Sequence, residues 1–252
     1  MLDNKTEIEE TSTPEITFHF DQKRDESKII SMLSRPNPIR GGSNFPEFIY
    51  KCHPGLRTRV TTTGNITTAV EEYVDEYYQI HKMEATNQLH QIETDWKLVE
   101  QPYLEAVDNI FDGSLWPYQT FRGIYTITYP CQRDLSTGRF QVGYDLSGYH
   151  KTAVAHELHH FRFYEYLRQR YCPSVELLDE REIAKILQPS FIIPVWELSE
   201  TLVKVHFEDQ PFSSLFPRTQ GYPGLADEYD QVRKYWQESG RNLSYFMQLI
   251  EN

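Results

Sequence analysis

Two histidines four positions apart, His156 and His160, are the residues of this sequence best suited to bind a metal ion. On an α-helix, side chains at this spacing project from the same face, one turn apart. Their imidazole nitrogens can then approach a single Zn²⁺ at the roughly 2.0–2.1 Å that Zn–N bonds require. Glu157 lies about 100° further around such a helix and can reach a metal-bound water without ligating the metal. The His-Glu-x-x-His pattern therefore predicts a zinc site with Glu157 as general base.

An α-helix has to carry these side chains, and the flanking residues favour one. Val154, Leu158 and Phe161 recur at helical spacing, which is typical of an apolar face turned away from the metal. We expect this helix to begin near residues 147–149 and to end before Pro173, because the residue preceding a proline is disfavoured in a helix. If no metal binds, the same pattern describes an ordinary half-buried helix that bears histidines.

This segment resembles the active-site helix of the zincin metallopeptidases. The metzincin extension of the motif is missing, because Phe163 and Tyr166 stand where that group has a glycine and a third histidine. The resemblance is therefore to gluzincins, and in particular to small microbial minigluzincins, in which a glutamate on a later helix completes the metal site. It implies an α+β, zincin-like fold that is mostly helical, with a small sheet next to the HExxH helix.

The expected glutamate helix lies within residues 194–205, where a proline suits the first turn and an apolar stripe follows. Glu200, in the segment Trp-x-x-Ser-Glu-x-Leu, resembles the glutamates of small gluzincin-like proteins and is the preferred third ligand. Glu197, one turn earlier, is the reserve: it is either the alternative ligand or the acceptor of a hydrogen bond from a ligand histidine. The alternative for both is a solvated position on an amphipathic helix.

The resemblance implies a zinc-dependent metallopeptidase that hydrolyses peptide bonds in peptide or protein substrates. Zinc held by the two histidines and Glu200 would polarise the scissile carbonyl, and Glu157 would carry a proton from the bound water to the leaving amine. His206 and Tyr222 follow the expected glutamate helix and are both candidates for donating a hydrogen bond to the oxyanion.

Three other classes of protein remain open. The first is a zinc-binding protein with the zincin fold but without protease activity, acting as a regulator or binding module. The second is a metal-free helical interaction protein, which long helices and an acidic surface favour. The third, a cysteine hydrolase, is less favoured because Cys131 and Cys172 lie in no recognisable nucleophile turn.

Charge and composition limit the partners. The 252 residues include 25 Lys and Arg against 37 Asp and Glu, which gives a net charge of −12. Nucleic acids and anionic membranes are polyanions, so we expect neither as a partner.

No segment approaches the roughly 18 apolar residues of a membrane span. The three cysteines lack CxxC spacing and give no disulfide framework. We expect a soluble, cytoplasmic protein, whose oligomeric state the sequence leaves open.

The polar N-terminal region predicts a boundary early in the chain. We expect residues 1–35 to form a polar, partly disordered leading segment, in which residues 16–20 alternate as in a short strand. A single domain would follow over residues 36–252, with its zincin-like core at about 120–208. Residues 34–55 are rich in turn residues and predict a long loop at this boundary.

Two strands are expected directly upstream of the HExxH helix. Residues 123–130 and 139–144 are rich in β-branched and aromatic side chains, with a turn-like segment between them. In zincins, the strand at the edge of the cleft pairs with an extended substrate peptide. The sequence does not say which strand holds that edge, and an ordinary hairpin with no substrate role is the alternative.

Overall fold

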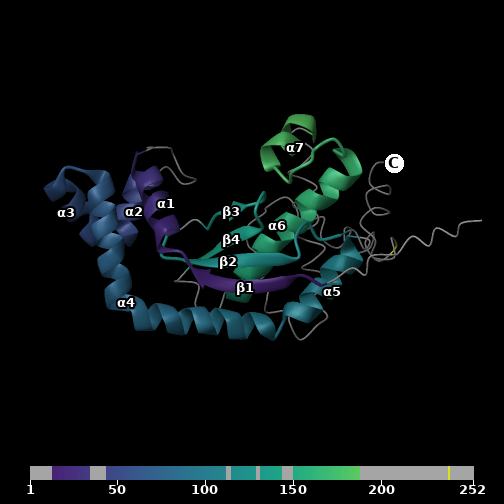
Figure 1. Cartoon of the computed structure of the whole chain (residues 1–252), viewed down its shortest axis with the longest axis horizontal. Helices are drawn as coiled ribbons and strands as arrows, with labels where there is room; N and C mark the ends of the chain where they lie inside the picture. Colours follow the sequence, from purple (N-terminus) through teal and green to yellow (C-terminus); the bar gives the residue numbers. More distant parts are fainter. Residues whose placement is uncertain are drawn as a thin grey trace, which may run out of the picture.

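The computed structural model describes residues 13–34, 44–111, 115–128, 131–143 and 150–187, together with Glu238. This part of the chain is mostly helical and contains a small mixed sheet, so the fold is α+β (Figure 1). Its elements are β1 (Glu15–Phe20), α1 (Gln22–Ser34), α2 (Phe45–Cys52), α3 (Pro54–Thr63), α4 (Ile66–Lys97), α5 (Glu100–Ile110), β2 (Thr120–Thr126), β3 (Arg133–Asp134), β4 (Arg139–Gly143), α6 (His150–Tyr171) and α7 (Glu180–Leu187). Among the described helices, none combines the length and the apolar character that crossing a lipid bilayer demands.

The four strands are ordered β1-β2-β4-β3. β1 and β4 both pair with β2 in parallel, and β3 pairs with β4 in the antiparallel direction. The two strands expected upstream of the HExxH helix are therefore parallel neighbours rather than the two arms of a hairpin. The hairpin is instead formed by β3 and β4, and Gly138, with φ of 67°, supplies the left-handed residue that precedes β4.

β1 and α1 pack with the rest of the described chain, so residues 15–34 are part of the domain rather than of a separate leading segment. β1 is the short strand expected at residues 16–20. β1 is an edge strand of the sheet, paired with β2 along its whole length. Ile16 of β1 and Ile29 of α1 are buried in the same core as the residues of β2 and α6. Asp25, Glu26 and Lys28 of α1 are buried as well, and the polar composition of residues 15–34 hid the contribution of the segment to the core.

α2 corrects a second expectation, because it lies within residues 34–55, where a long loop was predicted. Asn44 caps this helix: its side chain accepts a hydrogen bond from the Glu47 amide, and the Glu47 carboxylate accepts one from the Asn44 amide. This reciprocal arrangement is a capping box. Pro46 lies in the first turn, where a missing amide hydrogen costs no helical hydrogen bond.

An aromatic layer packs the sheet against α6. Phe18 of β1 and Phe140 of β4 meet edge to face across β2, with ring centroids 6.4 Å apart. They can do so because the residue between them is Gly123, where an added Cβ would lie 2.5 Å from the Phe18 ring. Phe161 of α6 completes the layer, with its ring 5.0 Å from that of Phe121. This packing sets the position of α6 beneath the sheet.

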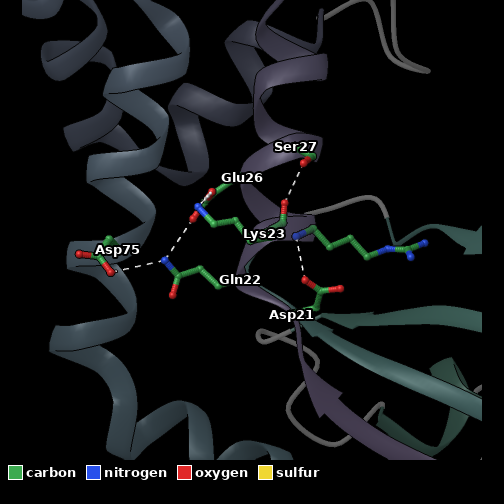
Figure 2. Close-up of polar contacts among 7 residues, drawn as sticks. Asp21, Gln22, Lys23, Glu26, Ser27 and Asp75 are labelled. Atoms are coloured by element: carbon green, nitrogen blue, oxygen red, sulfur yellow. Dashed lines mark hydrogen bonds and ion pairs between the residues drawn. The ribbon is translucent and has the colours of Figure 1, made fainter.

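α4 runs alongside β1, and α1, α2 and α3 gather at its N-terminal end (Figure 1). Figure 2 shows a polar contact between α1 and α4: the Gln22 amide donates to Asp75 of α4 at 3.5 Å, and within α1 it also donates to Glu26 at 3.1 Å. A buried contact reinforces them, because Tyr78 of α4 donates its hydroxyl to Asp25 of α1 at 2.7 Å. The backbone amide of Ile127 donates to the same carboxylate. Asp25 thereby links α1, α4 and the end of β2.

Candidate metal centre

α6 carries the HExxH residues, as expected, and it brings the two histidines together. The Nε2 atoms of His156 and His160 lie 3.2 Å apart, and the two rings stand at 89° to each other. Two nitrogens bound to one tetrahedral Zn²⁺ at roughly 2.0–2.1 Å are separated by about 3.3 Å. The observed separation fits that requirement. In the metal-free chain, the same arrangement lets one imidazole donate a hydrogen bond to the other.

The protein environment favours neutral imidazole at this position. His160 is 7% exposed, and burial lowers its pKa well below the usual value. The positive charge of Arg133 lowers the pKa of His160 further. Because only a neutral imidazole can ligate a metal, His160 is prepared for binding near neutral pH. His156 is half-buried, so the pair has access to the exterior through that side chain.

Glu157 lies beside the histidines in a largely buried position, with 6% of its surface exposed. Burial raises the pKa of its carboxyl group, and the nearby charges of His156, Arg133 and Lys28 lower it in part. Among the described residues, no group hydrogen-bonds to Glu157 Oε2. A carboxylate whose pKa is raised towards neutrality is suited to accept and return a proton.

His159 faces a different environment from its two neighbours. Its ring lies 5.5 Å from Phe111 and stacks on Phe163 of the next turn. This position places His159 in the aromatic packing between α5 and α6, on another face of the helix from the histidine pair.

Two buried contacts fix the position of α6 against α5. Tyr103 of α5 donates its hydroxyl to the backbone carbonyl of Ala155 at 2.6 Å, one residue before the HExxH segment. Arg162, which is fully buried, donates to Asp108 of α5 at 3.0 Å and lies over the Trp116 ring. Burial lowers the pKa of Arg162 to about 10. These contacts fix the rotation and translation of α6, and hence where the histidine pair points.

Sequence reasoning missed three residues that surround Glu157. Arg133 of β3 places its Nη1 atom 3.8 Å from Glu157 Oε2 and its Nη2 atom 3.5 Å from Glu180 Oε2 of α7. Tyr164 of α6 donates its hydroxyl to Glu180 at 2.9 Å, and its ring stacks on that of His160. No spacing rule connects these positions, because they lie on three separate elements. Of the three, only Tyr164 could have been found from helical periodicity, because it lies one turn after His160 on the same helix.

The remaining site residues expected from the sequence lie outside the described residues. They are Glu200, Glu197, His206 and Tyr222. Within the described part of the chain, no group of three or more His, Cys, Asp and Glu side chains gathers to hold a metal ion. The donor set of α6, two imidazole nitrogens at the right separation, fits zinc with one further protein ligand.

Comparison with known protein families, curated proteins and solved structures finds no match for this chain. The functional argument therefore rests on the geometry and chemistry of the site itself.

Proposed function

We propose that this protein is a zinc-dependent metallopeptidase. His156 and His160 hold the metal together with a third ligand, for which Glu200 is preferred and Glu197 is the reserve. The observation that carries this proposal is the 3.2 Å separation of the two Nε2 atoms beside a buried carboxylate, that of Glu157. When bound, zinc would polarise the scissile carbonyl and lower the pKa of a bound water towards about 7.

Glu157 is the general base in this proposal. Its buried carboxylate accepts the proton of the attacking water and then delivers it to the leaving amine. Burial raises the pKa of Glu157, which makes its carboxylate a stronger base for the first of these steps.

The position of β3 supports a peptide as the substrate. Arg133 lies opposite Phe140 of β4, and the adjacent bond of the ladder runs from the Gln141 amide to the Gln132 carbonyl at 2.8 Å. In an antiparallel ladder, the residue between such bonds directs its own amide and carbonyl to the other side. The Arg133 backbone therefore faces the side of β3 that no described strand pairs. An extended peptide can add there as a further strand, beside Glu157.

The arrangement of elements supports the finer proposal of a zincin-like fold. A small mixed sheet precedes the HExxH helix in the chain and packs against it, and the antiparallel edge strand β3 carries Arg133, which lies 3.8 Å from the candidate base. The third ligand would then arrive from the chain that follows α7.

Elemental analysis of the purified protein tests the metal site. We expect one zinc per chain in the wild type, and loss of zinc in His160→Ala and Glu200→Ala. If Glu200 is the ligand, Glu197→Ala should keep its zinc. If Glu197 is the ligand, Glu197→Ala should lose zinc and Glu200→Ala should keep it. Each variant is checked for folding by circular dichroism. A wild type without zinc after reconstitution would contradict the proposal.

Glu157→Gln tests the chemistry separately from the metal. This variant should retain stoichiometric zinc and lose hydrolysis of a peptide library, by at least about 100-fold, because general base catalysis is worth about 10²–10⁴ in rate. Full hydrolysis by Glu157→Gln would remove Glu157 from the base role. A zinc-loaded wild type that cleaves no peptide would indicate the non-protease, zinc-binding alternative instead.

A further inference from the structure

Arg133 connects the edge strand, the candidate base and α7 in one small cluster. Its side chain is 22% exposed and bridges two carboxylates: Glu157 on α6, at 3.8 Å, and Glu180 on α7, at 3.5 Å. Tyr164 anchors the far end of the cluster, because its hydroxyl donates to the second oxygen of Glu180. The guanidinium is thus held from one side by Glu180 and presented to Glu157 from the other.

The contacts of Arg133 are poorly suited to stabilising the fold. Charge-assisted hydrogen bonds between Arg and a carboxylate are usually about 2.7–2.9 Å long, whereas both ion pairs of Arg133 are longer. Its Nε is buried and has no hydrogen-bond partner among the described residues, which costs free energy. A half-buried guanidinium with two long ion pairs and an unpartnered Nε does little to stabilise the fold. Its location next to Glu157 needs another explanation.

Charge and position together supply that explanation. Glu157 Oε2 is buried, and the guanidinium of Arg133 lies 3.8 Å from it. Electrostatic attraction in a buried site is several times stronger than in water, so the guanidinium restrains where the carboxylate lies. The backbone of the same residue faces the free edge of β3, where a substrate peptide would pair.

We propose that Arg133 is a positioning residue that holds the Glu157 carboxylate in register with a peptide bound along β3. This inference rests on the proposed metallopeptidase function. The side chain of Arg133 orients the Glu157 carboxylate, and the backbone of Arg133 binds the substrate peptide. One residue therefore aligns the base with the substrate. Glu180 and Tyr164 keep the guanidinium from turning away. Arg133 does not contribute to holding the metal.

Steady-state kinetics of Arg133→Ala, on the library peptide that the wild type cleaves fastest, test this role. We expect kcat to fall by about 10–100-fold, because a misplacement of about 1 Å can cost about 100-fold in rate, while KM stays within about twofold.

Rescue experiments and a control variant accompany this measurement. Arg133→Lys should recover part of the loss of kcat. Added guanidinium chloride at millimolar concentration should partly restore Arg133→Ala but not Glu157→Gln. Arg181→Ala, which removes an exposed arginine next to Glu180, is the matched control and should behave as wild type.

Zinc affinity provides a readout independent of activity. Because a guanidinium repels a cation, Arg133→Ala should bind zinc as tightly as the wild type or more tightly. Weaker zinc binding would show that Arg133 builds the metal site, and unchanged kcat in Arg133→Ala would show that it does not position the base. Either result overturns the proposal.

Glu180→Gln keeps the test decisive if Arg133→Ala does not fold. This variant leaves Arg133 in place but weakens its tether, so kcat should fall by a smaller factor with zinc retained. Unchanged kcat in both Glu180→Gln and Arg133→Lys would then overturn the proposal.

Failure of the metallopeptidase function can be told apart from failure of the positioning role. If the wild type binds zinc but cleaves no peptide, both the metallopeptidase function and the role of Arg133 are refuted. An active wild type with an unaffected Arg133→Ala refutes the positioning role alone.

Discussion

At the residue scale, Lys28 is the buried charge with the clearest consequence for stability. Its ammonium group donates to Gln141 at 2.8 Å and to the backbone carbonyl of Thr128 at 3.3 Å, and the residue is 5% exposed. Burial lowers the pKa of Lys28 to about 8. The charges of Cys131 and Asp25 act in the opposite direction without restoring the usual value.

This lowered pKa predicts a pH dependence of unfolding. Between pH of about 8 and about 10.4, the unfolded chain binds a proton at Lys28 that the folded protein does not, so the free energy of unfolding rises with pH. The gain is at most about 3 kcal/mol. Urea denaturation at pH 7.5 and 9.5 should therefore show the wild type gaining stability relative to Lys28→Met. A difference between the two proteins that does not change with pH would contradict the prediction.

Cys131 makes the comparison with Lys28→Met necessary. Burial raises the pKa of this thiol to about 11, so the folded protein keeps a proton that the unfolded chain loses. Its contribution to stability therefore decreases as the pH rises, opposite in sign to that of Lys28. Because the cysteine is present in both proteins, the difference between them isolates most of the effect of the lysine.

At the element scale, the packing of the sheet on α6 depends on the absence of a side chain in β2. A Cβ at Gly123 would lie 2.5 Å and 2.7 Å from two carbons of the Phe18 ring and 3.2 Å from the Phe140 ring. Neither ring has room to withdraw, because both are buried in the shared core. β2 thus accepts aromatic neighbours from both flanking strands on the face that meets α6.

Gly123→Ala should consequently destabilise the protein by about 1–3 kcal/mol, the usual cost of overpacking a core. Gly55→Ala is the matched control, since a Cβ there would make an ordinary 3.4 Å contact with Tyr73. Urea denaturation of both variants measures the difference. Equal stability of Gly123→Ala and wild type would mean that the strands can separate without loss, against the packing described above.

At the scale of the whole molecule, the candidate metal site would join distant parts of the chain. The histidine pair lies on α6, and the third ligand is expected beyond α7. Zinc binding only to the folded state stabilises it by about 2.7 kcal/mol at a free concentration 100 times the Kd. For a chain of this size, each kcal/mol raises the Tm by about 2–4 °C.

Thermal unfolding with and without metal should therefore differ. We expect saturating zinc to raise the Tm of the chelator-treated wild type by about 5–10 °C, which combines the two relations above. EDTA should reverse the shift, and His160→Ala should show none. Differential scanning fluorimetry is sufficient for this measurement. An equal shift in His160→Ala would indicate zinc binding at another site.

Local features were predictable from the sequence by itself. The helix that carries His156, Glu157 and His160 was expected, and the structure places it at His150–Tyr171. The convergence of the two histidines follows from the four-residue spacing, because a helix turns once in 3.6 residues wherever it lies. The identity of the third ligand, Glu200 or Glu197, is still a prediction.

Tertiary structure decided everything that depends on segments far apart in the chain. It brought Arg133 and Glu180 to Glu157, made β2 and β4 parallel neighbours, and placed residues 15–34 inside the core. The physical reason is that strand order and ion pairs between elements depend on long-range packing, which leaves no periodic trace in any one segment. The sequence by itself determined a helix with two histidines on one face, and the fold determined which residues surround Glu157.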